Sequence, residues 1–336
     1  MCSLPEAAVS RRPRILLRVA AGPRLGFGHL VRARTLTRAL DADVRISVRG
    51  TARVIGIASR MALPLATGSI HAELADPSID LVVIDDPSRR EGNRVLRAAR
   101  RRGHAVASIH DRGIAPLRSD LAIDGTICPG IVPATRLLSG PAYALLDPSI
   151  ASGRRRARIK GRVLVTLGGG SRTQLARMIA AHVAERQPQA EVRLAGGWTT
   201  RGGRLPSRVA WLPTSSSLHG ELRRCEVAVV AGGMTLYEAA ALGTPAVAVS
   251  IVPAQRLSVR AFSRGGIALD GGLARGTSTA ARRSAMHVAG LVTRLLEEAP
   301  LRARLASKGP RIVDGRGAAR VASALIALAK QTRRRR

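Results

Sequence analysis

The sequence predicts an α/β protein made of two doubly wound, Rossmann-like domains with an interdomain cleft. Its 336 residues are about twice the usual length of a single domain. A buried strand, a glycine loop and a helix follow one another near the N-terminus, and the same order returns after residue 160. Strands that alternate with helices favour a parallel sheet covered on both faces. We therefore expect one such sheet in each half of the chain.

The first half contains short apolar runs that are typical of buried parallel strands. They are separated by arginine-rich segments of helical composition, such as residues 92–102. The predicted strands are residues 15–19, 44–48, 81–84 and 105–109. Glycines between Gly22 and Gly28 indicate a turn after the first strand, and residues 30–40 then have the composition of a helix.

A polar, turn-forming and strongly charged segment at residues 146–160 predicts a linker. The second half is expected to contain strands, a helix at residues 173–186 and a helical end. The predicted strands are residues 162–167, 191–194, 227–230 and 246–249, and the predicted late helices are residues 281–298, 301–308 and 317–330. This pattern divides the chain into domains at 1–150 and 160–310, followed by a C-terminal helix and basic tail at 311–336.

The formal net charge of +33 raises the question of an anionic partner. All but three of the 55 basic residues are arginines, a skew that we interpret as a coding bias that spreads charge over solvated faces. The two Phe, two Tyr and two Trp residues are scattered, so no platform for stacking nucleic-acid bases is visible. No specific nucleic-acid partner is expected. The positive electrostatic field of the protein would still attract an anionic substrate or a membrane-associated acceptor.

The three cysteines, Cys2, Cys128 and Cys225, have neither metal-ligand spacing nor the even number of a disulfide framework. A reducing cytoplasm fits them best. The first residues lack the apolar core of a secretory signal, and no stretch is long and uncharged enough to span a membrane. We expect a cytoplasmic protein with no metal, no cofactor and no transmembrane segment, and peripheral contact with a membrane stays open.

The first motif with chemical potential is Gly26-Phe27-Gly28-His29, with Arg32 three residues later. The glycines allow a tight turn, and the following helix offers unpaired N–H groups and a positive dipole end. His29 lies at that helix N-terminus, where an imidazolium is disfavoured, so it would be neutral and able to act as a base. A histidine that merely caps or packs the loop is the alternative.

The second motif is longer and joins residues 231–235 to Tyr237-Glu238. After the strand at 227–230, its glycines permit close approach of the backbone to a phosphate, while Thr235 and the helix N–H groups supply donors. Glu238 lies one turn into the helix, where a carboxylate can accept hydrogen bonds from both ribose hydroxyls of a nucleotide. The alternative is that Glu238 simply favours the helix dipole.

These motifs together support a resemblance to a known family. The segments RVAAGPRLGFGHLVRARTL, VLVTLGGGSRTQ, VVAGGMTLYEAAALGTPAVAV and VDGRGAARVA, with Gln255, occur in the family's order. The chain resembles the nucleotide-sugar hydrolases of pseudaminic acid biosynthesis and related spore-coat polysaccharide proteins. These are similar in turn to the lipid-linked N-acetylglucosaminyltransferase of peptidoglycan assembly. The resemblance covers almost the whole chain, and residues 313–321 favour its hydrolase branch.

The resemblance implies a GT-B fold, with the nucleotide held by the C-terminal domain and the catalytic loop supplied by the N-terminal domain. It implies that His29 activates the attacking water or hydroxyl and that no metal is essential. In the cleft, Gly28, Arg32 and Asp85 would lie on the sugar or acceptor side, and Gln255 would contact the sugar. The implied nucleotide ligands are Gly232, Gly233 and Thr235 for the pyrophosphate, Glu238 for the ribose, and Gly168, Gly169 and Gly170 across the cleft.

The sequence departs from the family at Ala20 or Ala21, at Ala254 and at Asp86-Pro87, all on the side that would choose the sugar or the acceptor. The predicted function is hydrolysis of a UDP-linked amino sugar at its anomeric carbon, in surface polysaccharide or nonulosonic acid biosynthesis. The alternative is a GT-B glycosyltransferase with a UDP-sugar donor, and a non-catalytic basic binding protein ranks below both. The identity of the sugar, the base, the acceptor and the oligomeric state stay open.

Overall fold

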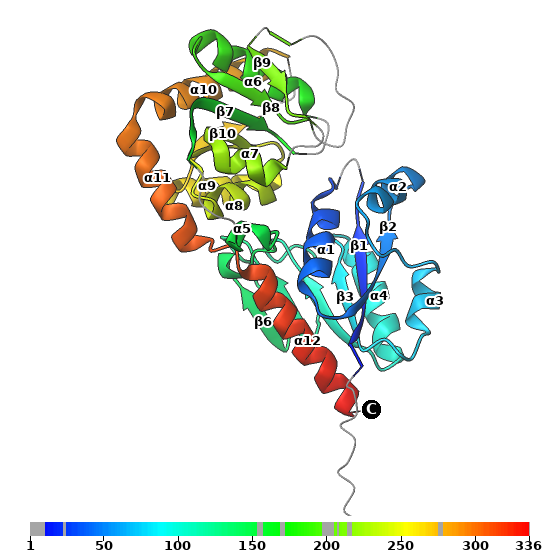
Figure 1. The fold of residues 1–336 in the computed structure, drawn as a ribbon. Coiled ribbons are helices and arrows are strands. Elements are labelled where there is room, and N and C mark those ends of the chain that lie inside the picture. The colour runs from blue at the N-terminus through cyan, green and yellow to red at the C-terminus, as the bar shows by residue number, and fades with distance from the viewer. Residues whose placement is uncertain are drawn as a thin grey trace, which may run out of the picture.

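The structure is a computed structural model that describes residues 11–22, 25–152, 157–168, 172–196, 205–206, 208–213, 217–274 and 278–335. Gly169 and Gly170, both predicted to line the cleft, lie outside the described residues. Within the described part, the chain forms two six-stranded parallel sheets, one in each half, with helices packed on them (Figure 1). The predicted α/β class with two doubly wound domains is confirmed.

The first sheet has the strand order β2-β1-β3-β4-β5-β6, and all its neighbouring strands pair in parallel. Its strands are β1 (Arg14–Ala20), β2 (Asp43–Arg49), β3 (Leu81–Asp85), β4 (Ala105–Ile109), β5 (Leu121–Asp124) and β6 (Arg136–Ser139). The helices of this half are α1 (Gly28–Ala39), α2 (Ala52–Arg60), α3 (Ile70–Leu74), α4 (Arg89–Arg101) and α5 (Ser149–Ser152). The order reverses between β1 and β3, which places a topological switch point there.

The second sheet has the order β12-β11-β10-β7-β8-β9. Its strands are β7 (Ile159–Thr166), β8 (Glu191–Leu194), β9 (Val209–Trp211), β10 (Cys225–Ala231), β11 (Ala246–Ser250) and β12 (Leu269–Leu273). Its helices are α6 (Thr173–Arg186), α7 (Leu218–Arg224), α8 (Met234–Ala241), α9 (Arg256–Arg264), α10 (Ser278–Glu297) and α11 (Ala299–Ile312). The switch point of this sheet lies between β7 and β10.

The last helix, α12 (Gly317–Arg335), leaves the second domain and packs against the first one (Figure 1). Val321 and Leu325 are fully buried in the same apolar cluster as Leu17 of β1 and Leu36 of α1. The sequence pattern placed a helix here but did not say which domain it would cover. The N-terminal domain therefore depends on the C-terminal end of the chain for part of its core.

We expect Leu325→Ala to lower the free energy of unfolding by about 2–5 kcal/mol, because it removes a fully buried side chain and leaves a cavity between α12 and the first sheet. Urea unfolding measures the loss. Ser323→Ala, on the exposed side of the same helix, is the matched control and should change the midpoint little. Equal midpoints for the two variants would contradict the packing described for α12.

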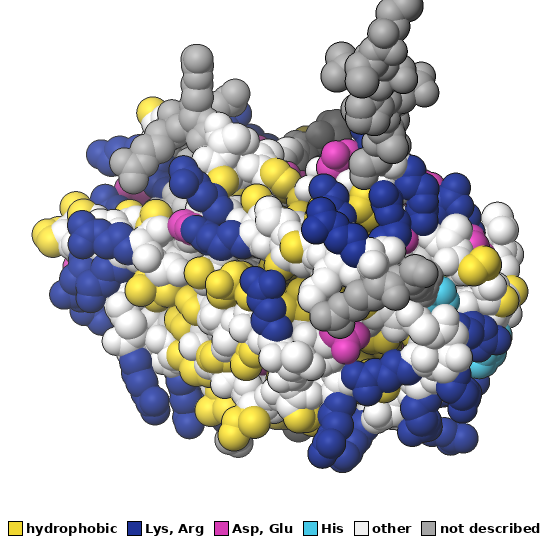
Figure 2. Space-filling model, turned by 90° about the horizontal axis from the view of Figure 1, so that it is seen from below, with side chains coloured by type: hydrophobic (Ala, Val, Ile, Leu, Met, Phe, Trp, Pro, Cys, Tyr) yellow, Lys and Arg dark blue, Asp and Glu magenta, His cyan; other side chains and the backbone are white. Residues whose placement is uncertain are grey.

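The basic side chains can be followed on one face of the molecule in Figure 2. In this view, arginine and lysine side chains are dispersed over the visible face, with apolar patches between them, and do not form one continuous basic track.

None of the helices in the described ranges is both long and apolar enough to cross a membrane. Among the same residues, no three or more His, Cys, Asp or Glu side chains are grouped so as to hold a metal ion.

Candidate functional site

The loops with chemical motifs lie at the carboxyl edges of the two sheets, beside the switch points. In the first domain, the loop that leads to His29 follows β1, and Asp85 ends the neighbouring strand β3. In the second domain, Gly168 follows β7, while Gly232 and Gly233 follow β10. In open α/β sheets, ligands bind at the carboxyl ends of strands at a switch point. Each domain thus brings its predicted motif to the place where its topology favours a ligand.

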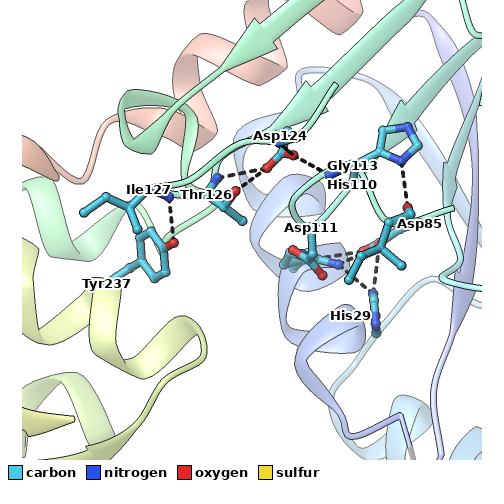
Figure 3. Close-up of polar contacts among 12 residues, drawn as sticks. His29, Asp85, His110, Asp111, Gly113, Asp124, Thr126, Ile127 and Tyr237 are labelled. Atoms are coloured by element: carbon cyan, nitrogen blue, oxygen red, sulfur yellow. Dashed lines mark hydrogen bonds and ion pairs between the residues drawn. The ribbon is translucent and has the colours of Figure 1, made fainter. Parts of the chain in front are cut away.

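His29 is the second residue of α1, and its ring points at Asp85 (Figure 3). His29 Nδ1 lies 2.8 Å from Asp85 Oδ1, and the His29 side chain is only 11% exposed. Arg32 Nη2 lies 2.6 Å from the same ring nitrogen. Arg32 can only donate and an ionised carboxylate can only accept, so Nδ1 cannot hydrogen-bond to both groups at once. Because Arg32 has its own acceptors in Asp85 and Asp111, we assign the ring hydrogen to Nδ1, where it is donated to Asp85. No hydrogen bond among the described residues uses Nε2, so its lone pair is available to a reacting hydroxyl.

Asp85 is ionised in spite of its burial. Burial alone would raise the pKa of the Asp85 carboxyl, but the charges of Arg32 and His29 and their hydrogen bonds outweigh it and hold that pKa at about 2. Burial opposes the charge of Arg32 as well, yet Asp111 and Asp85 raise the pKa of its guanidinium above the ordinary value. At neutral pH, His29 is therefore held by a buried carboxylate that stays negative.

Arg32 is buried beside Asp85. Its side chain is 7% exposed and lies behind His29, with Nε and Nη2 donating to the two oxygens of Asp85 at 3.1 and 2.7 Å. Its Nη1 donates to Asp111 Oδ1 at 2.5 Å, so the guanidinium bridges the ends of β3 and β4. Asp85 is also buried and faces His29 and Arg32. These contacts place both side chains behind His29, and their position on the sugar or acceptor side of a cleft stays a prediction.

The neighbouring polar residues have structural partners. Asp86 forms two hydrogen bonds of 2.7 Å with Arg49 of β2 and accepts a third from the Ser88 amide, so it faces away from Asp85. His110 Nε2 lies 2.7 Å from Ser108 Oγ, and burial lowers the pKa of the His110 ring. The adjacent pair of His110 and Asp111 is therefore not a catalytic dyad, since Asp111 binds Arg32 instead.

In the second domain, the glycine pair after β10 is packed tightly against Gln255. A Cβ at Gly232 would lie 2.5 Å from Val259 Cγ2 and 3.1 Å from Gln255 Cβ, so only glycine fits there without a shift. A Cβ at Gly233 would lie 3.6 Å from Gln255 Nε2. Gln255 is itself fixed, because its Oε1 accepts a hydrogen bond of 3.0 Å from the Ile251 amide. The predicted phosphate loop and the predicted sugar contact are thus neighbours.

Two helices present uncapped N-termini at this edge. The N-cap residues of α6 and α8, Arg172 and Gly233, form no side-chain cap, and neither helix has an acidic residue in its first turn. Thr235 is half-buried in the first turn of α8, and Gly168 has φ of +83° in the loop before α6. Unpaired N–H groups at helix N-termini, without a competing carboxylate, attract an anion such as a phosphate.

Glu238, the predicted ribose ligand, has a partner that the sequence analysis missed. Its Oε1 lies 3.1 Å from His219 Nε2 of α7, and its side chain is 7% exposed. Burial lowers the pKa of His219, but the hydrogen bond and charge of Glu238 outweigh it and raise that pKa above the ordinary value. Nothing in the local sequence pattern links His219 to Glu238, which is 19 positions away.

The helix that carries Glu238 also touches the first domain. The Ile127 amide, in the loop after β5, donates a hydrogen bond of 2.9 Å to Tyr237 Oη of α8 (Figure 3). Asp124, at the end of β5, holds this loop by accepting hydrogen bonds from the amides of Thr126, Gly130 and Gly113. The candidate donor helix is therefore tied to the loops beside Asp111. The cleft between the domains stays a prediction.

The comparisons with known proteins agree with this architecture. No family model matches the sequence. The chain is 29% identical over 210 residues to the spore coat polysaccharide biosynthesis protein SpsG of Bacillus subtilis (strain 168). That alignment covers 59% of this chain and 60% of the relative, so it spans less than two thirds of either protein.

Two solved structures are similar over almost the full length. A UDP-glucosyltransferase from Polygonum tinctorium has a TM-score of 0.67 at 12% identity, covering 96% of this chain and 100% of its own. The glycosyltransferase VinC, solved in complex with dTDP, has a TM-score of 0.60 at 16% identity, covering 95% and 100%. At these identities the likeness shows the fold, and it is the two-domain GT-B fold of glycosyltransferases.

Proposed function

We propose that this protein is a GT-B glycosyltransferase that uses a nucleotide-sugar donor, with the His29–Asp85 pair as its general base. The observation that carries the proposal is the buried, ionised Asp85 that holds the His29 ring at the switch point of the first sheet. A base oriented by a buried carboxylate is the arrangement that activates a hydroxyl nucleophile. The second sheet complements it with two uncapped helix N-termini suited to the donor diphosphate.

The chemistry follows from these positions. The acceptor hydroxyl gives its proton to His29 Nε2 as its oxygen attacks the anomeric carbon, and the bond from that carbon to the diphosphate oxygen breaks. Asp85 stabilises the imidazolium that forms, since its carboxylate faces Nδ1. The negative charge that develops on the leaving diphosphate is met by the N–H groups at the start of α8 and α6. Glu238 would accept hydrogen bonds from the ribose hydroxyls.

The comparisons support the transferase over the hydrolase predicted from the sequence. The similar solved structures reported above are named as glycosyltransferases, one for UDP and one bound to dTDP. The name of the Bacillus relative points to polysaccharide biosynthesis and specifies neither reaction. A transferase and a hydrolase differ here only in the nucleophile, a sugar hydroxyl or water, because His29 can deprotonate either. Product analysis separates them, since a hydrolase releases the free sugar without any acceptor.

Calorimetric titration with UDP, dTDP, GDP and CMP tests the donor site. We expect saturable binding of UDP or dTDP and a roughly 10- to 100-fold weaker affinity in Glu238→Gln, which loses a charged acceptor for the ribose hydroxyls. Glu185→Gln, an exposed site on α6, is the matched control and should bind like the wild type. A thermal melt of each variant verifies folding. Failure of the wild-type protein to bind any of the four nucleotides would refute the proposal.

A further inference from the structure

One arginine at the donor edge has no part in the site described so far. Arg172 is the N-cap residue of α6, and its Nη2 donates a hydrogen bond of 3.1 Å to the Ile251 carbonyl after β11. We propose that Arg172 binds the diphosphate of the donor and stabilises it as the leaving group. This inference rests on the proposed function and adds to it a residue that recognises the phosphate groups themselves.

The strand order fixes where this side chain runs. Arg172 follows β7, Ile251 follows β11, and β10 lies between these two strands in the sheet. Neighbouring strands lie about 4.8 Å apart, so the side chain must cross the end of β10 to reach Ile251. The residues that follow β10 are Gly232 and Gly233. The guanidinium is thereby carried across the strand end from which the phosphate loop begins.

A chain of contacts ties the same group to the loop. The Ile251 carbonyl accepts from Arg172, and the Ile251 amide donates to Gln255 Oε1. Gln255 in turn packs on Gly232 and Gly233. The Arg172 guanidinium and the Gln255 amide are therefore both held by the backbone of Ile251, next to the glycine pair. Both carry donors that a diphosphate can accept from.

The charge of Arg172 is not neutralised within the described residues. Other arginines of this sheet pair with carboxylates, such as Arg162 with Glu191 and Arg256 with Asp270. No carboxylate in the described part of the chain forms an ion pair with Arg172. Among the same residues, its guanidinium, which has five N–H donors, forms one hydrogen bond, to a backbone carbonyl. A planar guanidinium matches phosphate oxygens with two parallel hydrogen bonds. The carbonyl contact would hold the side chain in place for this role.

The test compares a nucleoside diphosphate with its nucleoside. Calorimetry of the full chain with UDP and uridine, and with dTDP and thymidine, gives the affinity that the phosphates contribute. We expect Arg172→Gln to weaken diphosphate binding roughly 10- to 100-fold and to leave nucleoside binding unchanged. Arg172→Lys should keep part of the affinity for the diphosphate, because lysine retains the positive charge but not the planar group that forms two parallel hydrogen bonds. Arg186→Gln, an exposed site at the other end of α6, should bind like the wild type.

The outcomes separate this inference from the proposed function. If the wild type binds UDP or dTDP and Arg172→Gln binds them equally well, the assignment of Arg172 is wrong and the donor site stands. An equal loss of diphosphate and nucleoside affinity would show a structural role and would also overturn the assignment. Absence of all nucleotide binding in the wild type would refute the proposed function and this inference with it.

Discussion

His29→Ala should reduce the turnover number for sugar transfer by roughly 10²- to 10⁴-fold, the usual contribution of a positioned general base. The reason is geometric, since Asp85 holds the ring through Nδ1 and leaves Nε2 to accept the proton of the acceptor hydroxyl. Initial rates of nucleotide release from the nucleotide sugar that the titrations select measure the loss. His29→Gln should be similarly impaired, because an amide fills the space but cannot take a proton.

His29→Ala should leave the affinity for the donor nucleotide almost unchanged, because the proposed nucleotide ligands lie in the other domain. The matched control is His71→Ala, an exposed histidine on α3, which should turn over like the wild type. A His29→Ala protein that binds the nucleotide and retains full turnover would show that another group removes the proton. Loss of both binding and turnover would instead indicate that His29 supports the site as a whole.

The fold could be predicted well wherever the local apolar pattern was continuous. β4 and β8 have the predicted bounds, and so does α6, because runs such as the one in β4 are buried on both faces and bounded by polar turns. β12 was not predicted, since its five residues include Asp270, Gly271 and Gly272 and do not read as a strand. It is formed by pairing with β11, a tertiary effect that outweighs local propensity.

The residues of the candidate site were largely visible in the sequence, but their arrangement was not. His29 and Asp85 were each singled out, yet the two residues are 56 positions apart, and their pairing depends on β1 and β3 being neighbours in the sheet. The burial of Arg32 has the same origin, because both of its acceptors arrive from distant strand ends. His219 and Arg172 gave no local signal, since one contacts Glu238 and the other Ile251 only through the fold.

Arg32→Met should lower the free energy of unfolding at pH 7 by about 3–5 kcal/mol, the range for removing one partner of a buried ion pair. Methionine retains much of the side-chain volume, so the main loss is the charge that compensates the buried Asp85. Urea unfolding measures it. Arg12→Met, which removes one partner of an exposed pair with Asp41, is the control and should show almost no change. Equal effects of the two substitutions would contradict the buried ion pair.

The pH dependence of this difference identifies the charge responsible. In the wild type, the pKa of Asp85 is about 2 when folded, against an ordinary value of 3.8. The folded pKa is depressed, so its stabilising contribution is present above pH 3.8 and is lost as the pH falls toward 2. Without Arg32, burial raises the pKa of the Asp85 carboxyl. Acidification then protonates Asp85 and removes the cost of burying an unpaired charge in the variant. The stability gap between the two proteins should therefore narrow from pH 7 toward pH 3. The double variant Arg32→Met/Asp85→Asn should recover part of the loss at pH 7, since no buried charge is then left unpaired; a gap that is independent of pH would assign the loss to packing instead.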